Sequence, residues 1–355
     1  MKINIIFPYN TWGGAFRSTY ELSNRMARKG EDVLVYFPFI PYLEGTNLYS
    51  INGLKLFLRG IARSAFRRAK IPWFDLKVPT RMVPIINDFF IRDADIVVAN
   101  HWPTAFSVNI LSNKKGKKYY FIRDTEPWSD AYHRELAAFR LPINKIVVSQ
   151  WIKDFLIEEV GTTVAGVVPN GTSIQEFKVT NKVFNKDPVI SMIYSDHPMK
   201  GIPDGMKVLK RVKNKFPNVK ILLFGFIKPK RNFNFDFIFR PFKNQLRSIY
   251  KQTDIFLSPS LQEGSGNPPR EAMLAKCCVV ATNVGCIPEV TIPGKTAIVV
   301  EPGDTKKMED MIIQLIKHPK KLEEIAANGQ NHIQKFTWDK STSKLIKIFK
   351  NGLED

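Results

Sequence analysis

Two glutamates, Glu263 and Glu271, lie eight residues apart around a glycine-containing segment, Gly-Ser-Gly-Asn-Pro-Pro-Arg. The preceding run, residues 254–258, is apolar and predicts a buried strand. Asn267 is predicted as the N-cap of a following helix, with Pro268 at its first position. A glycine loop and a helix start together suit an anion such as a diphosphate, and carboxylates accept hydrogen bonds from sugar hydroxyls. The segment therefore predicts a nucleotide-sugar site, the alternative being glutamates that only favour the helix dipole or solvent.

Lys200 precedes Gly201 and a predicted helix start. A cation at that position opposes the helix dipole unless an anion is shared, which is a local conflict typical of functional sites. The alternative is a solvated surface lysine. Asp93 and Asp95 could be taken for a metal-binding pair, but Asp95 leads directly into an apolar strand, and no cluster of His, Cys and carboxylates has metal-ligand spacing. We therefore expect no metal and no cofactor beyond a nucleotide-sugar substrate.

The net charge of +20 is high for a chain of 355 residues with 44% hydrophobic and 24% charged residues. It predicts an anionic partner, either a membrane surface, a nucleic acid or a polyanionic substrate, unless it only keeps the protein soluble. No apolar run approaches the roughly 20 residues that a membrane-spanning helix needs. Cys277, Cys278 and Cys286 show no disulfide or metal spacing and are expected in the core of a reduced, cytoplasmic protein.

Short apolar runs alternate with helical patterns along the whole chain, which predicts parallel sheets covered on both faces. A polar stretch near residues 180–187 separates two such series and predicts two Rossmann-like domains, with the ligand in a cleft between them. We place the first domain at residues 1–170, a linker at 171–187, the second domain at 188–337 and a final helix at 338–355. The predicted strands cover residues 3–7, 33–37, 95–99, 119–122, 146–149 and 164–168, then 189–194, 219–224, 254–258, 279–282 and 297–300.

The glutamate segment resembles the signature of family-4-type retaining glycosyltransferases of the GT-B fold, in which two glutamates are separated by seven residues. Other stretches resemble landmarks of the same family; these are residues 168–177, 198–201, 300–304 and 336–338. The resemblance implies an α/β protein of the GT-B fold, with the final helix crossing back to the first domain. It also implies that Glu263 contacts the donor sugar, Glu271 the ribose and Lys200 the diphosphate, and that the reaction retains anomeric configuration.

By this resemblance the donor site extends over both domains. Gly13 and Gly14 follow the first strand and would let the backbone approach the donor, although a plain tight turn explains them almost as well. The family usually has an arginine a few residues before the lysine, and residues 192–197 contain none. Arg270 is the candidate substitute; otherwise the diphosphate is held less tightly. The complete predicted donor set is Gly13, Gly14, Lys200, Glu263, Gly264, Ser265, Gly266, Asn267, Arg270 and Glu271.

The acceptor side is expected at the ends of two first-domain strands. Where the family often carries a His-Asp pair, this chain has Arg123 and Asp124. Asp124 could orient or deprotonate an acceptor hydroxyl, with Glu126 in reserve, or it could cap the next helix. The pattern Asp-x-Glu-Pro at this point resembles bacterial polysaccharide glycosyltransferases, some of which transfer rhamnose. His101 ends another strand and either lines the acceptor site or forms a structural hydrogen bond.

A basic amphipathic helix is predicted over residues 54–74, where no acidic residue interrupts the run from Lys55 to Lys70. Such a helix is typical of a membrane interface; a helix packed on its own domain and a polyanion-binding patch are the alternatives. The membrane-binding candidates are Lys55, Arg59, Arg63, Arg67 and Arg68.

These features together predict an enzyme that moves a sugar from a nucleotide-diphosphate sugar to a glycan or lipid-linked acceptor in cell-surface polysaccharide synthesis. We expect it at the inner face of the cell membrane, as a peripheral, cytoplasmic protein. No zinc finger, RNP-like strand or helix-turn-helix pattern favours nucleic acid as a partner. A polyanion- or nucleic-acid-binding protein, a non-catalytic glycan-binding scaffold and a nucleotide-sugar epimerase or hydrolase are the alternatives.

Overall fold

The computed structural model describes residues 1–9, 14–39, 71–229, 235–241 and 243–354. The chain forms two compact units, Met1–Asn170 with Trp338–Asp355 as the first and Gly171–Thr337 as the second. Each is a parallel sheet with helices packed on it, so the expected α/β architecture of two Rossmann-like domains is confirmed.

The first sheet contains seven strands among the described residues, in the order β3-β2-β1-β4-β5-β6-β7, and every pairing is parallel. The strand order reverses between β1 and β4, as in a doubly wound fold. The strands are β1 (Lys2–Ile6), β2 (Asp32–Pro38), β3 (Thr80–Val83), β4 (Ile96–Ala99), β5 (Lys117–Ile122), β6 (Asn144–Val147) and β7 (Gly166–Val167).

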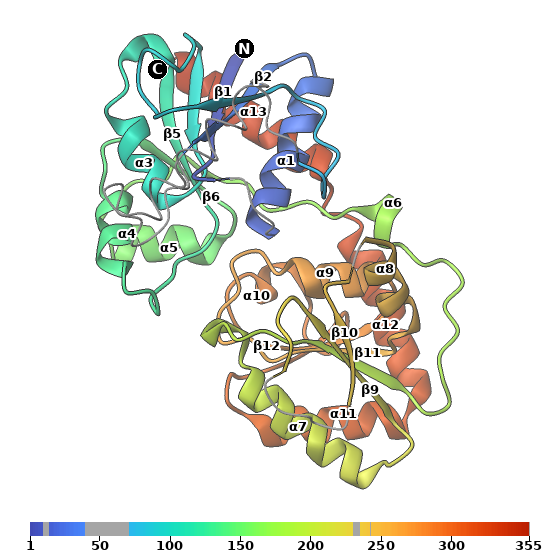
Figure 1. Ribbon diagram of the computed structural model, residues 1–355. Helices are drawn as coiled ribbons and strands as arrows, with labels where there is room; N and C mark the ends of the chain where they lie inside the picture. The colour runs from blue at the N-terminus through green and yellow to red at the C-terminus, as the bar shows by residue number, and fades with distance from the viewer. Residues whose placement is uncertain (10–13, 40–70, 230–234, 242, 355) are drawn as a thin grey trace. The chain divides into compact units, whose positions relative to one another are not determined.

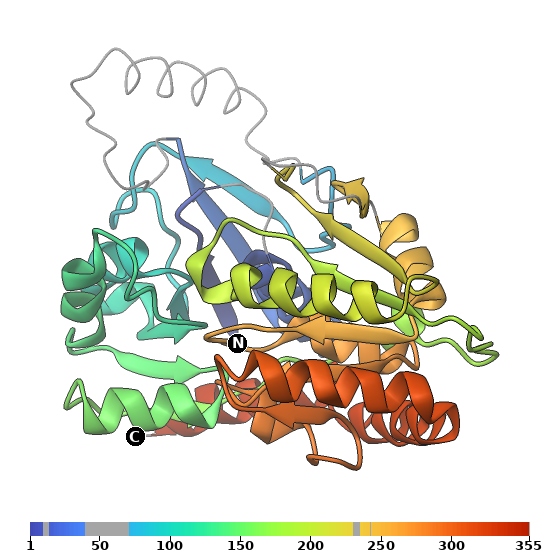
Figure 2. The same cartoon turned by 90° about the horizontal axis from the view of Figure 1, so that it is seen from below.

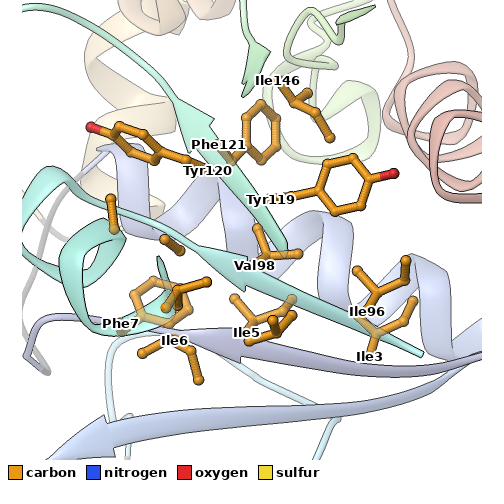
Figure 3. Packing of buried hydrophobic residues seen from close by; sticks show 14 of the residues in the cluster. Ile3, Ile5, Ile6, Phe7, Ile96, Val98, Tyr119, Tyr120, Phe121 and Ile146 are labelled. Carbon is orange, nitrogen blue, oxygen red and sulfur yellow. The ribbon is translucent and has the colours of Figure 1, made fainter. Parts of the chain in front are cut away.

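Apolar side chains fill both faces of this sheet because helices cover each of them. Figure 3 shows the packing around β1, β4, β5 and β6, where Ile3, Val98 and Tyr119 are among the buried residues. A strand enclosed on two sides needs apolar residues at successive positions, which is why Ile96–Ala99 is apolar and buried throughout.

In the first unit, helix α13 (Trp338–Glu354) packs beside helix α1 (Gly14–Arg28) (Figure 1). The ring of Phe349 on α13 lies 5.0 Å from the ring of Tyr119, and Arg25 of α1 lies 5.9 Å from the ring of Trp338. The described helices are α1 (Gly14–Arg28), α3 (Trp102–Asn109), η1 (Asn113–Lys115), α4 (Tyr132–Phe139), α5 (Gln150–Glu158) and α13 (Trp338–Glu354).

The second sheet repeats the same topology, with the described strands in the order β10-β9-β8-β11-β12-β13 and all pairings parallel. Here the order reverses between β8 and β11. The strands are β8 (Val189–Ile193), β9 (Lys220–Gly225), β10 (Asp236–Phe239), β11 (Ile255–Ser258), β12 (Cys278–Thr282) and β13 (Ile298–Val300).

Helices cover both faces of the second sheet. On one face α7 packs against α11, and these two lie in front of the sheet in Figure 2. On the other face α6, α8 and α9 enclose a separate apolar cluster. The helices are α6 (Ile174–Phe177), η2 (Pro198–Lys200), α7 (Ile202–Lys215), α8 (Lys243–Gln252), α9 (Asn267–Leu274), α10 (Ile287–Val290), α11 (Thr305–Lys317) and α12 (Pro319–Ile333).

Two strands were missing from the sequence prediction, β3 and β10. Both lie at an edge of their sheet and are only partly buried. Strand β3 begins with the polar residues Thr80 and Arg81, and the apolar run of β10 is only three residues long and follows Asp236. Residues 171–187, expected as a linker, belong to the second unit, where Phe177 of α6 is fully buried. The three cysteines are buried, as predicted, and form no disulfide with one another. None of the helices in the described ranges is long and apolar enough to cross a membrane.

Candidate functional site

The candidate donor residues of the second unit meet at the point where its strand order reverses. Strands β8 and β11 are adjacent and parallel, so the segments that follow them leave the same edge of the sheet. The segment after β8 carries Lys200, and the segment after β11 carries Glu263. In open α/β sheets, ligands bind at this edge and at such reversal points.

Lys200 and Glu263 form an ion pair. The Nζ of Lys200 lies 2.7 Å from Oε1 of Glu263, and the hydroxyl of Ser260 donates to the same oxygen at 2.7 Å. Glu263 is 5% exposed, whereas Lys200 is half-buried. The structure thus brings together two of the residues predicted to hold the donor, and it adds Ser260, which the sequence did not single out.

The two segments are joined closely by their backbones. The N–H of Leu261 donates to the carbonyl of Met199 at 2.7 Å. Gly201 has a φ of +57°, and a Cβ at this position would lie 1.9 Å from the carbonyl oxygen of Pro259. Only glycine fits this close approach, so Gly201 allows the lysine-bearing segment to lie against the glutamate-bearing one.

A third segment, which follows β12, supports Glu263 from the other side. The N–H of Cys286 donates to the carbonyl of Glu263 at 3.2 Å. Gly285 has a φ of +52°, and a Cβ there would lie 1.9 Å from that same carbonyl oxygen. Sequence reasoning gave no role to Gly285. The available signal was a glycine shortly after a strand whose neighbour in the sheet carries the site.

Helix α9 begins at Asn267, with Gly266 as its N-cap in the left-handed conformation. The expectation that Asn267 is the N-cap was therefore wrong by one residue, because its backbone is already helical. The hydroxyl of Ser265 lies 3.5 Å from Oδ1 of Asn267. Gly264 and Gly266 are buried, and Ser265 is half-buried. The loop and the first turn of α9 thus form one compact corner beside Glu263.

Glu271 lies in the second turn of α9 and is half-buried. Its Oε2 accepts a hydrogen bond from the hydroxyl of Tyr250 at 3.2 Å. Tyr250 is a fully buried residue of α8, so this contact orients the carboxylate from a neighbouring helix. The sequence did not indicate Tyr250.

Arg270 is 2% exposed, and its guanidinium lies 5.2 Å from the ring centroid of Phe336. Burial lowers the pKa of Arg270, and the nearby Cys286 and Glu289 partly offset that effect. Arg270 is thus a buried residue of α9 that packs against Phe336. Its role as a diphosphate ligand stays a prediction, since a guanidinium stacked on a ring keeps the N–H donors in its plane.

In the first unit, Gly13 and the membrane-binding candidates Lys55, Arg59, Arg63, Arg67 and Arg68 lie outside the described residues. Gly14 is the first residue of α1 and is exposed. Its carbonyl accepts a hydrogen bond from the hydroxyl of Ser18 at 2.9 Å.

Arg123 follows β5 directly, and its guanidinium reaches three neutral side chains. It donates to the hydroxyl of Thr19 at 2.7 Å and to Oδ1 of Asn100 and of Asn170, each at 3.4 Å. Its Cζ also lies 4.2 Å from the ring centroid of Phe121. Burial lowers the pKa of Arg123 to about 9, at which the side chain is still charged at neutral pH.

His101 follows β4, next to Asn100, and precedes α3. Its backbone N–H donates to the hydroxyl of Thr104 at 3.3 Å. Among the described residues, its Nδ1 has no hydrogen-bond partner. Burial lowers the pKa of His101 to about 4, so the imidazole is neutral at physiological pH.

Asp124 and Glu126 lie near a third carboxylate that the sequence did not indicate, Glu135 of α4. Oδ1 of Asp124 accepts the N–H of Thr125 at 3.0 Å, and Oε2 of Glu135 accepts the N–H of Glu126 at 2.8 Å. Glu135 is 4% exposed. Burial raises its pKa to about 8, and the charges of Glu126 and Asp124 act in the same direction. The only sequence signal was a glutamate on the apolar face of a short helix.

The two aspartates considered as a metal pair have structural partners. Oδ2 of Asp95 accepts the N–H of Lys2 at 2.7 Å, and Asp93 forms an ion pair with Lys115 at 2.7 Å. Within the ranges that the structure covers, no three His, Cys, Asp or Glu side chains are grouped so that they could hold a metal ion.

Comparison with known families divides the chain in the same way. Residues 173–332 match the family described as "Glycosyl transferases group 1", and residues 12–176 match "Glycosyltransferase Family 4". Among curated proteins, the chain is 26% identical over 260 residues to the capsular polysaccharide biosynthesis glycosyltransferase CapM of Staphylococcus aureus. That match covers 66% of this chain and 65% of CapM, which is less than two thirds of the relative's own length.

Solved structures share the fold over almost the whole chain. HepE from Anabaena, in complex with UDP and glucose, has a TM-score of 0.73 at 17% identity and covers 99% of both chains. TarM from S. aureus, in complex with fondaparinux, alpha-GlcNAc-glycerol and UDP, has a TM-score of 0.73 at 14% identity, over 98% of this chain and 99% of that one. The two family matches together extend over residues 12–332, and they meet within six residues of the boundary between the two Rossmann-like units. The chain therefore belongs to the glycosyltransferases of the GT-B fold.

Proposed function

We propose that this protein transfers a sugar from a nucleotide-diphosphate sugar to a glycan or lipid-linked acceptor in cell-surface polysaccharide synthesis. The Lys200–Glu263 pair at the reversal point of the second sheet is the observation that carries the proposal. It combines a cation suited to a diphosphate with a buried carboxylate suited to sugar hydroxyls. The relationship to CapM supports the polysaccharide context, and the ligands of HepE and TarM support a nucleotide-sugar donor and a glycan acceptor.

In this proposal Lys200 neutralises the departing diphosphate. An ammonium group has three donors, so Lys200 can keep its bond to Glu263 and still donate to phosphate oxygens. The backbone N–H groups of residues 265–267, at the start of α9, supply further positive potential. Glu263 binds hydroxyls of the donor sugar and Glu271 binds the ribose. No metal takes part, and the anomeric configuration is retained.

On the acceptor side, Asp124 orients or deprotonates the attacking hydroxyl, with Glu126 in reserve. The buried carboxyl of Glu135 lies beside both and is protonated at neutral pH, because its pKa is raised to about 8. It therefore adds no second negative charge at the position where Asp124 must act as a base.

Access to a lipid-linked acceptor explains the basic segment of the sequence. We place the protein at the inner face of the cell membrane, held there by Lys55, Arg59, Arg63, Arg67 and Arg68. Attraction to an anionic leaflet contributes about 1 kcal/mol for each basic residue near the surface.

A panel of nucleotide sugars tests the donor assignment. The cognate donor should raise the melting temperature in proportion to its concentration, because a bound ligand stabilises the folded state by mass action. Products are then analysed with and without an added glycan acceptor. Release of free sugar or an epimerised nucleotide without acceptor would instead identify a hydrolase or an epimerase. If no nucleotide sugar stabilises the protein while generic DNA binds with a steep salt dependence, the polyanion-binding alternative replaces this proposal.

A further inference from the structure

The first unit contains a half-buried cation, Arg123, whose contacts among the described residues are all neutral. Arg123 donates to Thr19, Asn100 and Asn170, and the two bonds to asparagine oxygens are 3.4 Å long, at the weak end of the range. No carboxylate of the described residues forms an ion pair with it. The residues outside the described ranges contribute only Glu44 and Asp355 as further acids.

A charge in such surroundings is costly unless it is paired. Removing a guanidinium from water without an opposite charge costs several kcal/mol, and neutral oxygens recover only part of this. Arg123 is nevertheless partly exposed, so an anion can reach it. An ionisable group perturbed by desolvation in this way is a candidate for a functional site.

A second donor in the same cluster, the amide of Asn100, has no acceptor among the described residues. Asn100 is 3% exposed, and its Oδ1 accepts from the Thr19 hydroxyl and from Arg123. These two bonds fix the orientation of the amide, and among the described residues its Nδ2 has no hydrogen-bond partner. The cluster therefore holds two kinds of donor, a guanidinium and an amide, and the described residues offer too few acceptors for them.

The position of the cluster agrees with a ligand site. Asn100 follows β4 and Arg123 follows β5, which are adjacent parallel strands, and Thr19 belongs to the helix that follows β1. The order of the first sheet reverses between β1 and β4. The cluster thus lies at the carboxyl edge of the sheet, next to the point where doubly wound domains bind their ligands.

We propose that Arg123 and Asn100 form an oxyanion-binding site in the first unit, which receives a carboxylate or phosphate group of the acceptor. A guanidinium presents parallel N–H groups that match both oxyanions, and charge-assisted bonds of this kind are about twice as strong as neutral ones. This inference rests on the proposed function, which it deepens, because it makes the acceptor an acidic glycan or a phosphate-bearing lipid.

The full-length protein is titrated calorimetrically with inorganic phosphate, with methyl glucuronoside and with neutral methyl glucoside. We expect both acids to bind and the neutral glycoside not to bind. Arg123→Gln should lower the affinity for both acids by about tenfold or more, since it removes a charge-assisted bond. Arg123→Lys should have an affinity between those of the wild type and Arg123→Gln, because a lysine cannot bind an oxyanion in a bidentate manner. If phosphate binds more tightly than the glucuronoside, the acceptor carries a phosphate; the reverse order indicates an acidic sugar.

Asn100→Asp is the second variant, because it places a carboxylate beside Arg123 without changing side-chain size. We expect it to abolish binding of both acids and to leave the fold at least as stable as the wild type, since the cation then has an internal partner. The matched control is Asn113→Asp, at an exposed position of η1. This variant should change neither the binding of the acids nor the stability of the fold. If Arg123→Gln does not fold, the binding of the two acids to Asn100→Asp tests the proposal.

Three results would overturn the proposal. The first is that the wild type binds neither acid, and the second is that Arg123→Gln or Asn100→Asp binds them as the wild type does. The third is a loss of UDP affinity in Arg123→Gln equal to its loss of phosphate affinity, which would assign the oxyanion to the donor. Since none of these measurements requires turnover, a protein that binds the acids but no nucleotide sugar would contradict the proposed function and leave this site standing.

Discussion

The ammonium of Lys200 lies 2.7 Å from the carboxylate of Glu263, although 63 residues separate them in the chain. The contact exists because β8 and β11 are neighbours in the sheet and because Gly201 permits the close approach of the segments that follow them. This pair has two roles in our interpretation, one in folding and one in donor binding, and the two can be separated experimentally.

Lys200→Ala should lower the affinity for the cognate nucleotide sugar by about an order of magnitude or more, since it removes a charge-assisted bond to the diphosphate. It should also lower the free energy of unfolding by about 1–3 kcal/mol, because a buried carboxylate loses its partner. Adding Glu263→Gln should restore much of the stability but none of the affinity. Urea denaturation and calorimetry measure the two effects.

The control for this pair is Lys207→Ala, which removes an exposed lysine of α7 and changes the net charge by the same amount. It should change neither stability nor affinity appreciably. Equal nucleotide-sugar affinity in Lys200→Ala and the wild type would rule out the role of Lys200 in donor binding.

Gly285→Ala should displace Glu263. The left-handed conformation alone costs a non-glycine residue about 1–2 kcal/mol. At this position the new Cβ would also meet the carbonyl of Glu263 at 1.9 Å, so the segment must move. Gly303→Ala is the matched control, because Gly303 has a φ of +81° and open space around its Cβ position. We expect both variants to lose stability and only Gly285→Ala to lose donor affinity; equal affinities would show that the contact does not position Glu263.

Glu271→Ala should weaken donor binding by about tenfold or more, as expected for the loss of a ribose contact made by a charged acceptor. Tyr250→Phe removes only the hydroxyl that bonds Glu271 and keeps the buried ring. It should weaken binding by about two- to tenfold through loss of orientation. A nucleoside diphosphate lacking the 2′- and 3′-hydroxyls provides the check, since neither variant should further reduce its affinity. A further loss with this analogue would place Glu271 elsewhere than at the ribose.

The central strands could be predicted from the sequence because a strand buried on both faces leaves a continuous apolar run. Strands β3 and β10 were not predicted, because their edge positions leave them partly exposed and their apolar runs are short. The Lys200–Glu263 corner was also predictable, since its glycines, prolines and charges follow directly after such apolar runs.

The environments of side chains could not be predicted. The position of Glu135 on the apolar face of a short helix is a weak signal, because its burial depends on which face of α4 meets the core. The surroundings of Arg123 combine residues from α1 and from the ends of three strands, which only the sheet order brings together. Likewise, the contact of Gly285 with Glu263 depends on the pairing of β11 with β12.

Glu135 should make stability depend on pH. Burial raises its pKa from the ordinary 4.5 to about 8, so the folded protein keeps this proton at pH values where the unfolded chain has lost it. Stability from this group therefore falls as the pH rises from about 4.5 to about 8, by at most about 1.4 kcal/mol per unit. Glu135→Gln can still accept the N–H of Glu126 and should gain stability relative to the wild type across this range.

Chemical denaturation at several pH values between about 4.5 and about 8 measures this difference. Glu158→Gln, at an exposed position on α5, is the control and should show a difference from the wild type that does not vary with pH. A similarly constant difference for Glu135→Gln would mean that its carboxyl titrates in the ordinary range and is not protonated beside Asp124.

Replacement of Lys55, Arg59, Arg63, Arg67 and Arg68 by Gln should reduce binding to anionic vesicles. Because each basic residue near an anionic surface contributes about 1 kcal/mol, the loss should exceed about a hundredfold in partition coefficient and should shrink in high salt. Cosedimentation with vesicles of mixed phosphatidylserine and phosphatidylcholine measures it. The control removes five exposed lysines of the second unit, Lys295, Lys307, Lys317, Lys320 and Lys321, and therefore the same net charge. If both variants lose binding equally, the attraction is a property of the whole charge of +20; a selective loss in the first variant assigns it to the segment between residues 54 and 74.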